Sequence, residues 1–192
     1  MTDLDLISKN FIKSSELIKE LSKEDFTKKI AEVSELICQA YASGNKLLAA
    51  GNGGSATDAQ HIVSELVNKF YHERKPLNAI SLTADTAVLT SCANDYSYDT
   101  IFSRQIEAQG KPGDVFIAIT TSGNSENIIK AVEKAKSLGV KTIGLLGKDG
   151  GKLKGMCDYE LIVPDSDVAR IQEAHRVIYH TMCELIEKRF LE

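Results

Sequence analysis

Two side chains that can carry protons lie one helical turn apart, just after a glycine-rich turn. His61 and Glu65 follow the turn GNGGS at residues 51–55, and a spacing of four residues places them on one face of a helix. Imidazoles and carboxylates are the usual general acids and bases near neutral pH, and both also bind metal ions. A pair at this spacing is often an ordinary surface hydrogen bond, so its interpretation depends on the neighbouring turn.

The glycine-rich turn and a second loop, TTSGNSEN at residues 120–127, are typical of anion-binding sites. Each loop is expected to follow a strand and to open a helix. Glycine permits tight bends, and the first turn of a helix presents unpaired N–H groups and the positive end of the helix dipole. Hydroxyl groups in both loops can donate hydrogen bonds to phosphate oxygens. They belong to Ser55, Thr120, Thr121, Ser122 and Ser125.

Two other interpretations of these loops were weighed. They are ordinary strand-to-helix turns if Ser55 and Ser125 simply cap the helices. Residues 51–56 also fit the dinucleotide-binding pattern G-x-G-x-x-G/A. That pattern expects an acidic residue about 20 residues further on, but Asp85 lies more than 30 residues after Gly51. A dinucleotide fold also gives no reason for the second loop, so we favour a phosphate site.

The last helical segment presents two differently directed faces. Its apolar stripe comprises Ile171, His175, Ile178, Met182 and Leu185. We therefore expect His175 to be a packed core residue, whereas Gln172 and His180 fall on another face at about 100° per residue. These two residues, taken together with His61 and Glu65, allow two interpretations. His61, Glu65 and His180 suit zinc, with Gln172 as an unusual fourth ligand. Without a metal, Glu65 removes a proton from carbon and His180 shuttles a proton.

Short apolar runs alternate with helical segments after residue 44, which is typical of parallel strands buried on both faces. The expected strands are 46–50, 78–82, 114–119, 141–146 and 159–163. This pattern predicts an α/β three-layer sandwich with a five-stranded parallel sheet in the flavodoxin-like order 2-1-3-4-5. In that order strands one and three are neighbours, so both loops meet at the switch point.

Two amphipathic helices are expected before the first strand. One covers about residues 4–21, and the second has Ser22 as its expected N-cap and Gly44 as its stop. We expect residues 1–43 to form a helical extension that packs in an oligomer. The whole chain, 1–192, is expected to form a single domain, because one core serves a chain of this length.

Composition excludes several classes of function. The net charge is −4 with acidic and basic residues interspersed, which predicts no nucleic-acid partner and no anionic membrane partner. No apolar run approaches the roughly 20 residues that span a bilayer. Four cysteines are scattered without a CxxC pair, and the N-terminus does not resemble a signal peptide. We therefore expect a cytoplasmic protein with reduced thiols.

Four motifs together carry a family resemblance. AAGNGGSATDAQHIVSEL, LTADTAVLTSCANDYSYDTIFSRQIEAQGKPGD, TTSGNSENIIKA and ARIQEAHRVIYHTMCELIE closely resemble the phosphoheptose isomerases of the sugar isomerase (SIS) domain family, in order from about residue 30 to the end. The resemblance implies conversion of D-sedoheptulose 7-phosphate to D-glycero-D-manno-heptose 7-phosphate, toward the heptose of lipopolysaccharide. It also implies a cytoplasmic homotetramer with sites between subunits and one zinc ion per subunit.

The resemblance also assigns roles to residues. The implied catalytic pair is Glu65 and His180. The implied metal ligands are His61, Glu65, Gln172 and His180. The implied substrate contacts are Asn52, Gly53, Gly54, Ser55, Glu65, Asn94, Asp95, Thr120, Thr121, Ser122, Ser125 and Gln172.

The chain departs from the family pattern in two places, and two other functions were weighed. Asn68-Lys69 stands where many relatives carry Gly-Arg, which keeps a cation but loses a bidentate donor. Thr120-Thr121 replaces a common Ser-Thr. The alternatives are a non-catalytic SIS-fold regulator that binds the bacterial replication initiator and a sugar-phosphate-binding module. The retained acid and base residues argue against a regulator, which needs none.

Overall fold

Within residues 1–191, which the computed structural model describes, five parallel strands form one sheet in the order β2-β1-β3-β4-β5. The strands are β1 (Leu47–Gly51), β2 (Ala79–Ser81), β3 (Val115–Thr120), β4 (Lys141–Gly147) and β5 (Tyr159–Val163). Every expected strand is found, and the predicted strand order is confirmed. Gly51 at the end of β1 is paired with Ile119 near the end of β3, so the loops that follow these strands start side by side.

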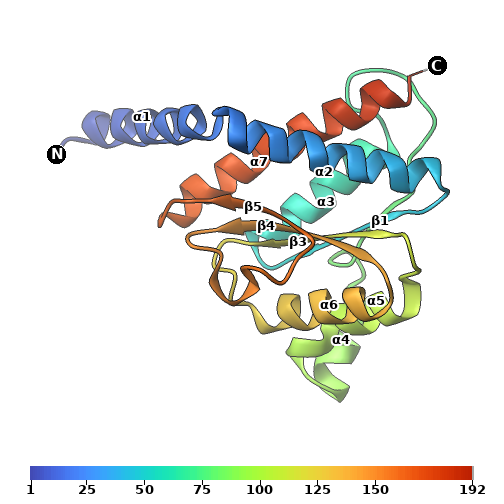
Figure 1. The fold of residues 1–192 in the computed structure, drawn as a ribbon. Helices are drawn as coiled ribbons and strands as arrows, with labels where there is room; N and C mark the ends of the chain where they lie inside the picture. Colours follow the sequence, from blue (N-terminus) through green and yellow to red (C-terminus); the bar gives the residue numbers. More distant parts are fainter. Residues whose placement is uncertain (192) are drawn as a thin grey trace.

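Helices cover both faces of this sheet (Figure 1). The α-helices are α1 (Asp3–Leu21), α2 (Glu24–Ala42), α3 (Gly54–Val67), α4 (Thr86–Asp95), α5 (Ile101–Gln109), α6 (Glu126–Ser137) and α7 (Val168–Arg189), and the short 3-10 helices are η1 (Tyr98–Thr100) and η2 (Gly151–Leu153). α2, α3 and α7 lie on one face, and α4, α5 and α6 lie on the other. The predicted three-layer sandwich is confirmed.

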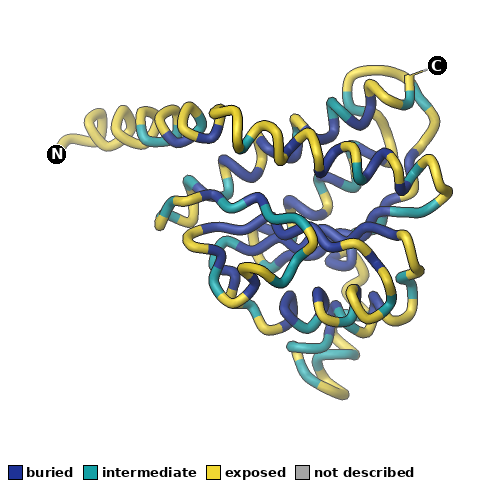
Figure 2. The backbone as a smooth tube through the Cα atoms, in the orientation of Figure 1, coloured by how far each residue is buried: buried dark blue, intermediate teal, exposed yellow. Residues whose placement is uncertain are grey.

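Alternate strand residues build two separate hydrophobic cores. In β1, Leu47 and Ala49 pack with α2, α3 and α7, whereas Leu48 and Ala50 pack with α5 and α6. Figure 2 shows the central strands β1, β3 and β4 buried along nearly their whole length between the two helical layers, whereas the edge strands β2 and β5 are partly half-buried. Side chains of period two thus bury both faces, as parallel sheets require.

The first two helices differ in how far they join this core. Ile30, Val33 and Ile37 of α2 are buried in the layer that contains α7, so α2 belongs to the body of the fold. The first half of α1 extends beyond the body (Figure 1) and exposes large apolar side chains. These include Leu4, Ile7, Phe11 and Ile12. Packing of residues 1–43 in an oligomer stays a prediction.

The expected N-cap of the second helix is wrong. Ser22 ends α1, where its N–H binds the Ile18 carbonyl and its hydroxyl donates to the Lys19 carbonyl. Lys23 takes the N-cap position of α2 without a side-chain capping bond. The hydroxyl is used by the preceding helix end because serine can bond to backbone groups on either side.

None of the helices in the described part of the chain is long and apolar enough to cross a membrane. The four cysteines occur as free thiols.

Candidate active site

The two predicted anion loops enclose a small cavity at the carboxyl ends of β1 and β3. Its volume is about 210 Å³, and the residues that line it are Asn52, Ser55, Ile119, Thr120, Thr121, Ser122, Ser125, Val168 and Gln172. All five predicted hydroxyl residues are among them. A reciprocal amide pair joins the loops, since Asn52 and Asn127 each donate to the other's side-chain oxygen over 2.9 Å.

The local structure of this cavity suits an anion. α3 and α6 both begin at it, so their unpaired N–H groups and positive dipole ends are close by. Gly53 caps α3 with a φ of 56°, a backbone conformation that glycine adopts without steric cost. Ser125 occupies the N-cap of α6 but makes no capping bond, and its hydroxyl lies 3.4 Å from that of Thr120. Ser55 is inside α3, so neither serine serves merely as a cap.

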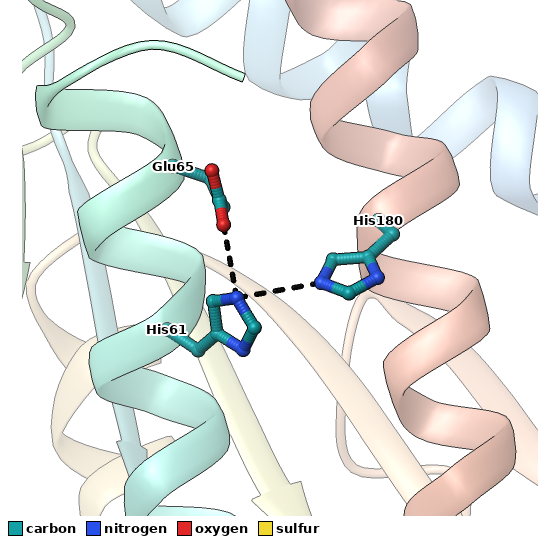
Figure 3. A group of neighbouring side chains, drawn as sticks. All are labelled: His61, Glu65 and His180. Atoms are coloured by element: carbon teal, nitrogen blue, oxygen red, sulfur yellow. Dashed lines mark hydrogen bonds and ion pairs between the residues drawn. The ribbon is translucent and has the colours of Figure 1, made fainter. Parts of the chain in front are cut away.

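His61, Glu65 and His180 form a cluster further along α3 and α7 (Figure 3). Nε2 of His61 lies 2.9 Å from Oε1 of Glu65 and 3.5 Å from Nε2 of His180. One ligand atom from each residue lies within 4.8 Å of the other two. α3 supplies the first two side chains and α7 the third, so the two helices face each other here.

The chemistry of this cluster fits a metal ion. Two imidazole nitrogens and one carboxylate oxygen converge on one point, and zinc binds such atoms at about 2.0–2.2 Å with an open fourth position in catalytic sites. Burial, and then the neighbouring His61, lower the pKa of His180, which favours the neutral imidazole that metal binding needs. The same neutral ring can take part in proton transfer.

Gln172 belongs to the hydroxyl-lined cavity within one chain. It packs so closely on Gly54 that a Cβ there would lie 2.3 Å from Nε2 of Gln172. Eight residues separate it from His180, which corresponds to about 12 Å along a helix. The structure therefore brings Gln172 to the predicted substrate contacts and not to the other three predicted metal ligands.

Asn94 and Asp95 are not brought to the cavity either. Both lie exposed at the end of α4, where the Asn94 amide donates to the Asp95 carboxylate over 2.8 Å. Neither lines the cavity. The nearby Tyr98 of η1 contacts a residue that lines the cavity, since its hydroxyl donates to the side-chain oxygen of Asn52 over 2.9 Å.

Residues behind the cluster were missed by sequence reasoning. Tyr179 places its hydroxyl 3.0 Å from Nδ1 of His61 and 3.3 Å from the buried carboxylate of Asp58. Burial raises the pKa of Asp58 and raises that of Tyr179 to about 12. The signal that could have found Asp58 is its position three residues before His61, on the same helix face. A buried tyrosine next to His180 leaves no comparable pattern.

A second missed group fixes the loop between α3 and β2. The buried carboxylate of Glu187 accepts hydrogen bonds from the N–H groups of Phe70, Tyr71 and His72 over 2.8–3.0 Å. Arg74 lies 3.6 Å from the same carboxylate and donates to the Glu65 carbonyl over 2.7 Å. This loop therefore ties the end of α3 to the end of α7.

The chain is similar to known proteins over nearly its whole length. The model of the SIS domain matches residues 10–147. A phosphoheptose isomerase of Clostridium acetobutylicum is 55% identical over 186 residues, with 94% of this chain and 95% of the relative covered. Among solved structures, a phosphoheptose isomerase from Francisella tularensis has a TM-score of 0.94 at 41% identity, covering 98% of this chain and 100% of that one. The corresponding protein from Neisseria gonorrhoeae has a TM-score of 0.92 at 39% identity, covering 97% and 100%.

Proposed function

Because the chain belongs to the phosphoheptose isomerases of the SIS domain family, we propose that it converts D-sedoheptulose 7-phosphate to D-glycero-D-manno-heptose 7-phosphate. The observation that carries this proposal is the arrangement along α3 and α7. Gly54 faces Gln172 at the hydroxyl-lined cavity, and His61 faces His180 at the acid-base cluster. The two helices therefore run in parallel, and they carry an anion-binding site near their first residues and a proton-transfer group further along.

The cavity between the two loops binds the phosphate in this proposal. Hydroxyl groups and helix N-termini supply hydrogen-bond donors there, and the cavity is lined by no lysine or arginine within the described residues. Binding the phosphate away from the reacting carbons fixes the orientation of the sugar, which can contribute several kcal/mol to lowering the barrier.

The acid-base cluster carries the chemistry. Glu65 removes a proton from C1 of the ketose and returns it to C2, which produces the aldose through an enediol(ate). His180 moves the proton between the two sugar oxygens during the same conversion. Both side chains are only half-buried, so a substrate can reach them.

The cluster also supports a zinc ion held by His61, Glu65 and His180. Zinc supplies a Lewis acid that polarises the sugar oxygens when it is bound. Its ligand chemistry is compatible with the proposed roles, because the neutral imidazoles and the carboxylate that hold a metal are also the groups required for proton transfer.

We extend the proposal to a homotetramer whose sites lie between subunits. Asn94 and Asp95 do not line the cavity, and Gln172 lies about 12 Å along α7 from His180, so in this proposal a second copy completes the set of contacts. The exposed apolar side chains at the start of α1 offer a surface for such packing. Light scattering on the purified protein should give the mass of four chains, and a monomer that is fully active would refute this part.

We also place the reaction in the cytoplasm, where free thiols are stable. The product would then supply the heptose of lipopolysaccharide. These two points rest on the family and on the thiols rather than on the site.

The proposal is tested by following aldose formation from sedoheptulose 7-phosphate by NMR. Glu65→Gln and His180→Gln should lower kcat by at least about 100-fold, which is the usual contribution of a general acid or base. Exchange of the C1 proton with D₂O should fall in parallel for Glu65→Gln, because that step breaks the C–H bond.

Matched controls are available on α7 and in the loop between α3 and β2. Glu184→Gln changes an exposed carboxylate of α7 that pairs with Lys188, and His72→Gln changes an exposed imidazole. Both should keep wild-type activity. Wild-type protein without activity, with or without added zinc, would refute the proposal and favour a sugar-phosphate-binding or regulatory role.

A further inference from the structure

A hydrogen-bond network lies on the far side of the His61 ring from the acid-base cluster. The Tyr179 hydroxyl contacts Nδ1 of His61 over 3.0 Å and Oδ1 of Asp58 over 3.3 Å. Nε of Arg176 donates to the same hydroxyl over 3.2 Å. Tyr179 is 0% exposed and Asp58 is 1% exposed, so water does not compete for the bond between these two residues.

The donor and acceptor inventory of this network fixes where the hydroxyl proton goes. An ionised Asp58 only accepts hydrogen bonds, and Arg176 only donates them. Tyr179 therefore gives its single proton to Asp58 and accepts from its other two partners. One of those partners is Nδ1 of His61, which must then carry the ring proton. Nε2 is left with a lone pair directed at the cluster.

Glu65 alone would favour the opposite tautomer. Its carboxylate lies 2.9 Å from Nε2 of His61 and would hold a proton there. The tautomer thus depends on two carboxylates, since Glu65 acts on Nε2 directly and Asp58 acts on Nδ1 through the Tyr179 hydroxyl. The Glu65 side chain is 21% exposed and that of Asp58 is 2% exposed. Water weakens the Glu65 interaction, whereas the buried Asp58 acts in a less polar medium where electrostatic interactions are stronger.

We propose that Tyr179 and Asp58 are positioning residues that hold His61 in the Nδ1–H tautomer, so that Nε2 is free to bind a cation. The preformed lone pair then faces Glu65 and His180 before any metal arrives. Such partners behind a ligating histidine commonly change metal affinity by 10- to 100-fold. The proposal rests on the proposed zinc site for this affinity, but the tautomer itself is a property of the metal-free protein.

The tautomer is measured directly by long-range ¹H–¹⁵N spectra of the imidazoles in metal-free protein at mildly alkaline pH, where histidines are neutral. The chain has four histidines, and the His61→Gln variant identifies the signals of His61. We expect the Nδ1–H form in the wild type and a shift toward the Nε2–H form in Tyr179→Phe. A wild-type His61 that is protonated on Nε2 overturns the proposal without recourse to any variant.

Zinc affinity, measured by competition with a chromophoric chelator, gives the second readout. Tyr179→Phe should weaken zinc binding by 10- to 100-fold, with a smaller loss for Asp58→Asn, which keeps the shape of the side chain and serves if the first variant does not fold. Tyr41→Phe is the matched control, because the Tyr41 hydroxyl is buried without a hydrogen-bond partner. Wild-type affinity in a folded Tyr179→Phe protein overturns the proposal. If the wild type binds no zinc, the metal part of the proposed function fails, and the tautomer spectra alone support or reject this inference.

Discussion

Replacing Glu187 by glutamine should loosen the loop of residues 68–78 from the end of α7. The carboxylate receives the N–H group of Phe70 on one oxygen and those of Tyr71 and His72 on the other. A glutamine of the same shape has one oxygen to offer, so its NH₂ group must face at least one backbone N–H. The side chain of Arg74, 1% exposed beside this carboxylate, also loses its counter-charge.

The expected loss of stability in Glu187→Gln can be worked out from these contacts. Hydrogen bonds to a charged acceptor contribute about 1.5–3 kcal/mol each, roughly twice the value of neutral bonds. Losing one such bond and weakening two others costs about 4 kcal/mol by this reckoning. That is a large fraction of the 5–15 kcal/mol that stabilises typical domains. Because the Phe70 ring lies 5.7 Å from that of His180, the loosened loop should also reduce activity.

Urea unfolding at neutral pH measures the loss of stability, and amide hydrogen exchange of residues 70–72 measures the loosening of the loop. The control is Glu184→Gln, three residues earlier on α7, whose exposed pair with Lys188 should be worth less than about 0.5 kcal/mol.

The contribution of Glu187 to stability should depend on pH in a defined direction. Burial by itself would raise the pKa of Glu187, but the three N–H donors and Arg74 bring it below the ordinary value of 4.5. The unfolded chain therefore binds the proton more readily, and the stabilisation is present above pH 4.5 and lost as pH falls through the folded pKa. The advantage of the wild type over Glu187→Gln should shrink in that acid range. Unchanged exchange at residues 70–72 in the variant would refute this account of the loop.

Three further outcomes are expected. Gly54→Ala should raise KM for the sugar phosphate by about tenfold, or 1.4 kcal/mol, at nearly unchanged thermal stability, because the new Cβ displaces the flexible end of Gln172; an unchanged KM contradicts this. Burial lowers the pKa of His175 to about 4, so the unfolded chain takes up a proton before the folded chain does. The free energy of unfolding of the wild type should therefore fall by about 3 kcal/mol between pH 6.5 and pH 4. Urea titrations should show a smaller pH dependence in His175→Gln. Removing metal with a chelator should abolish activity and added zinc should restore it, whereas full activity in protein shown to be metal-free by elemental analysis rules out an essential ion.

Apolar periodicity predicted the strands, and the common doubly wound strand order predicted that the two loops meet at one cavity. The apolar runs of β1 and β3 determine their burial, and the 2-1-3-4-5 order then forces the loops at residues 51–55 and 120–127 together. Spacing also separated His175, which is fully buried, from the half-buried His180 on the other face of α7. The burial of the strands and the two faces of α7 were predictable because each depends on local order along one strand or helix, whereas the meeting of the loops followed from the common strand order.

The interactions that sequence reasoning missed join positions far apart in the chain. Tyr179 and Asp58 are 121 residues apart, and Glu187 lies 117 residues from Phe70. No periodic pattern connects such pairs, because their contact depends on how α3 and α7 pack. The prediction that Ser22 caps the second helix was wrong for a different reason. The serine hydroxyl can bond to the end of α1 or to the start of α2, and the sequence on both sides permits either arrangement.

The position of α7 is set by three buried polar contacts along its length. Near its start, Nε2 of His175 contacts the Leu146 carbonyl at the tip of β4 over 3.0 Å, and at its end Glu187 binds the loop that follows α3. Between them, Tyr179 links α7 to Asp58 of α3. A shift of α7 would move Gln172 and His180 together, since a helix transmits displacement along its length. The separation between the hydroxyl-lined cavity and the acid-base cluster is therefore maintained by these three buried contacts. In the proposed function, residues that do not contact the substrate thus help to set the distance between its two binding points.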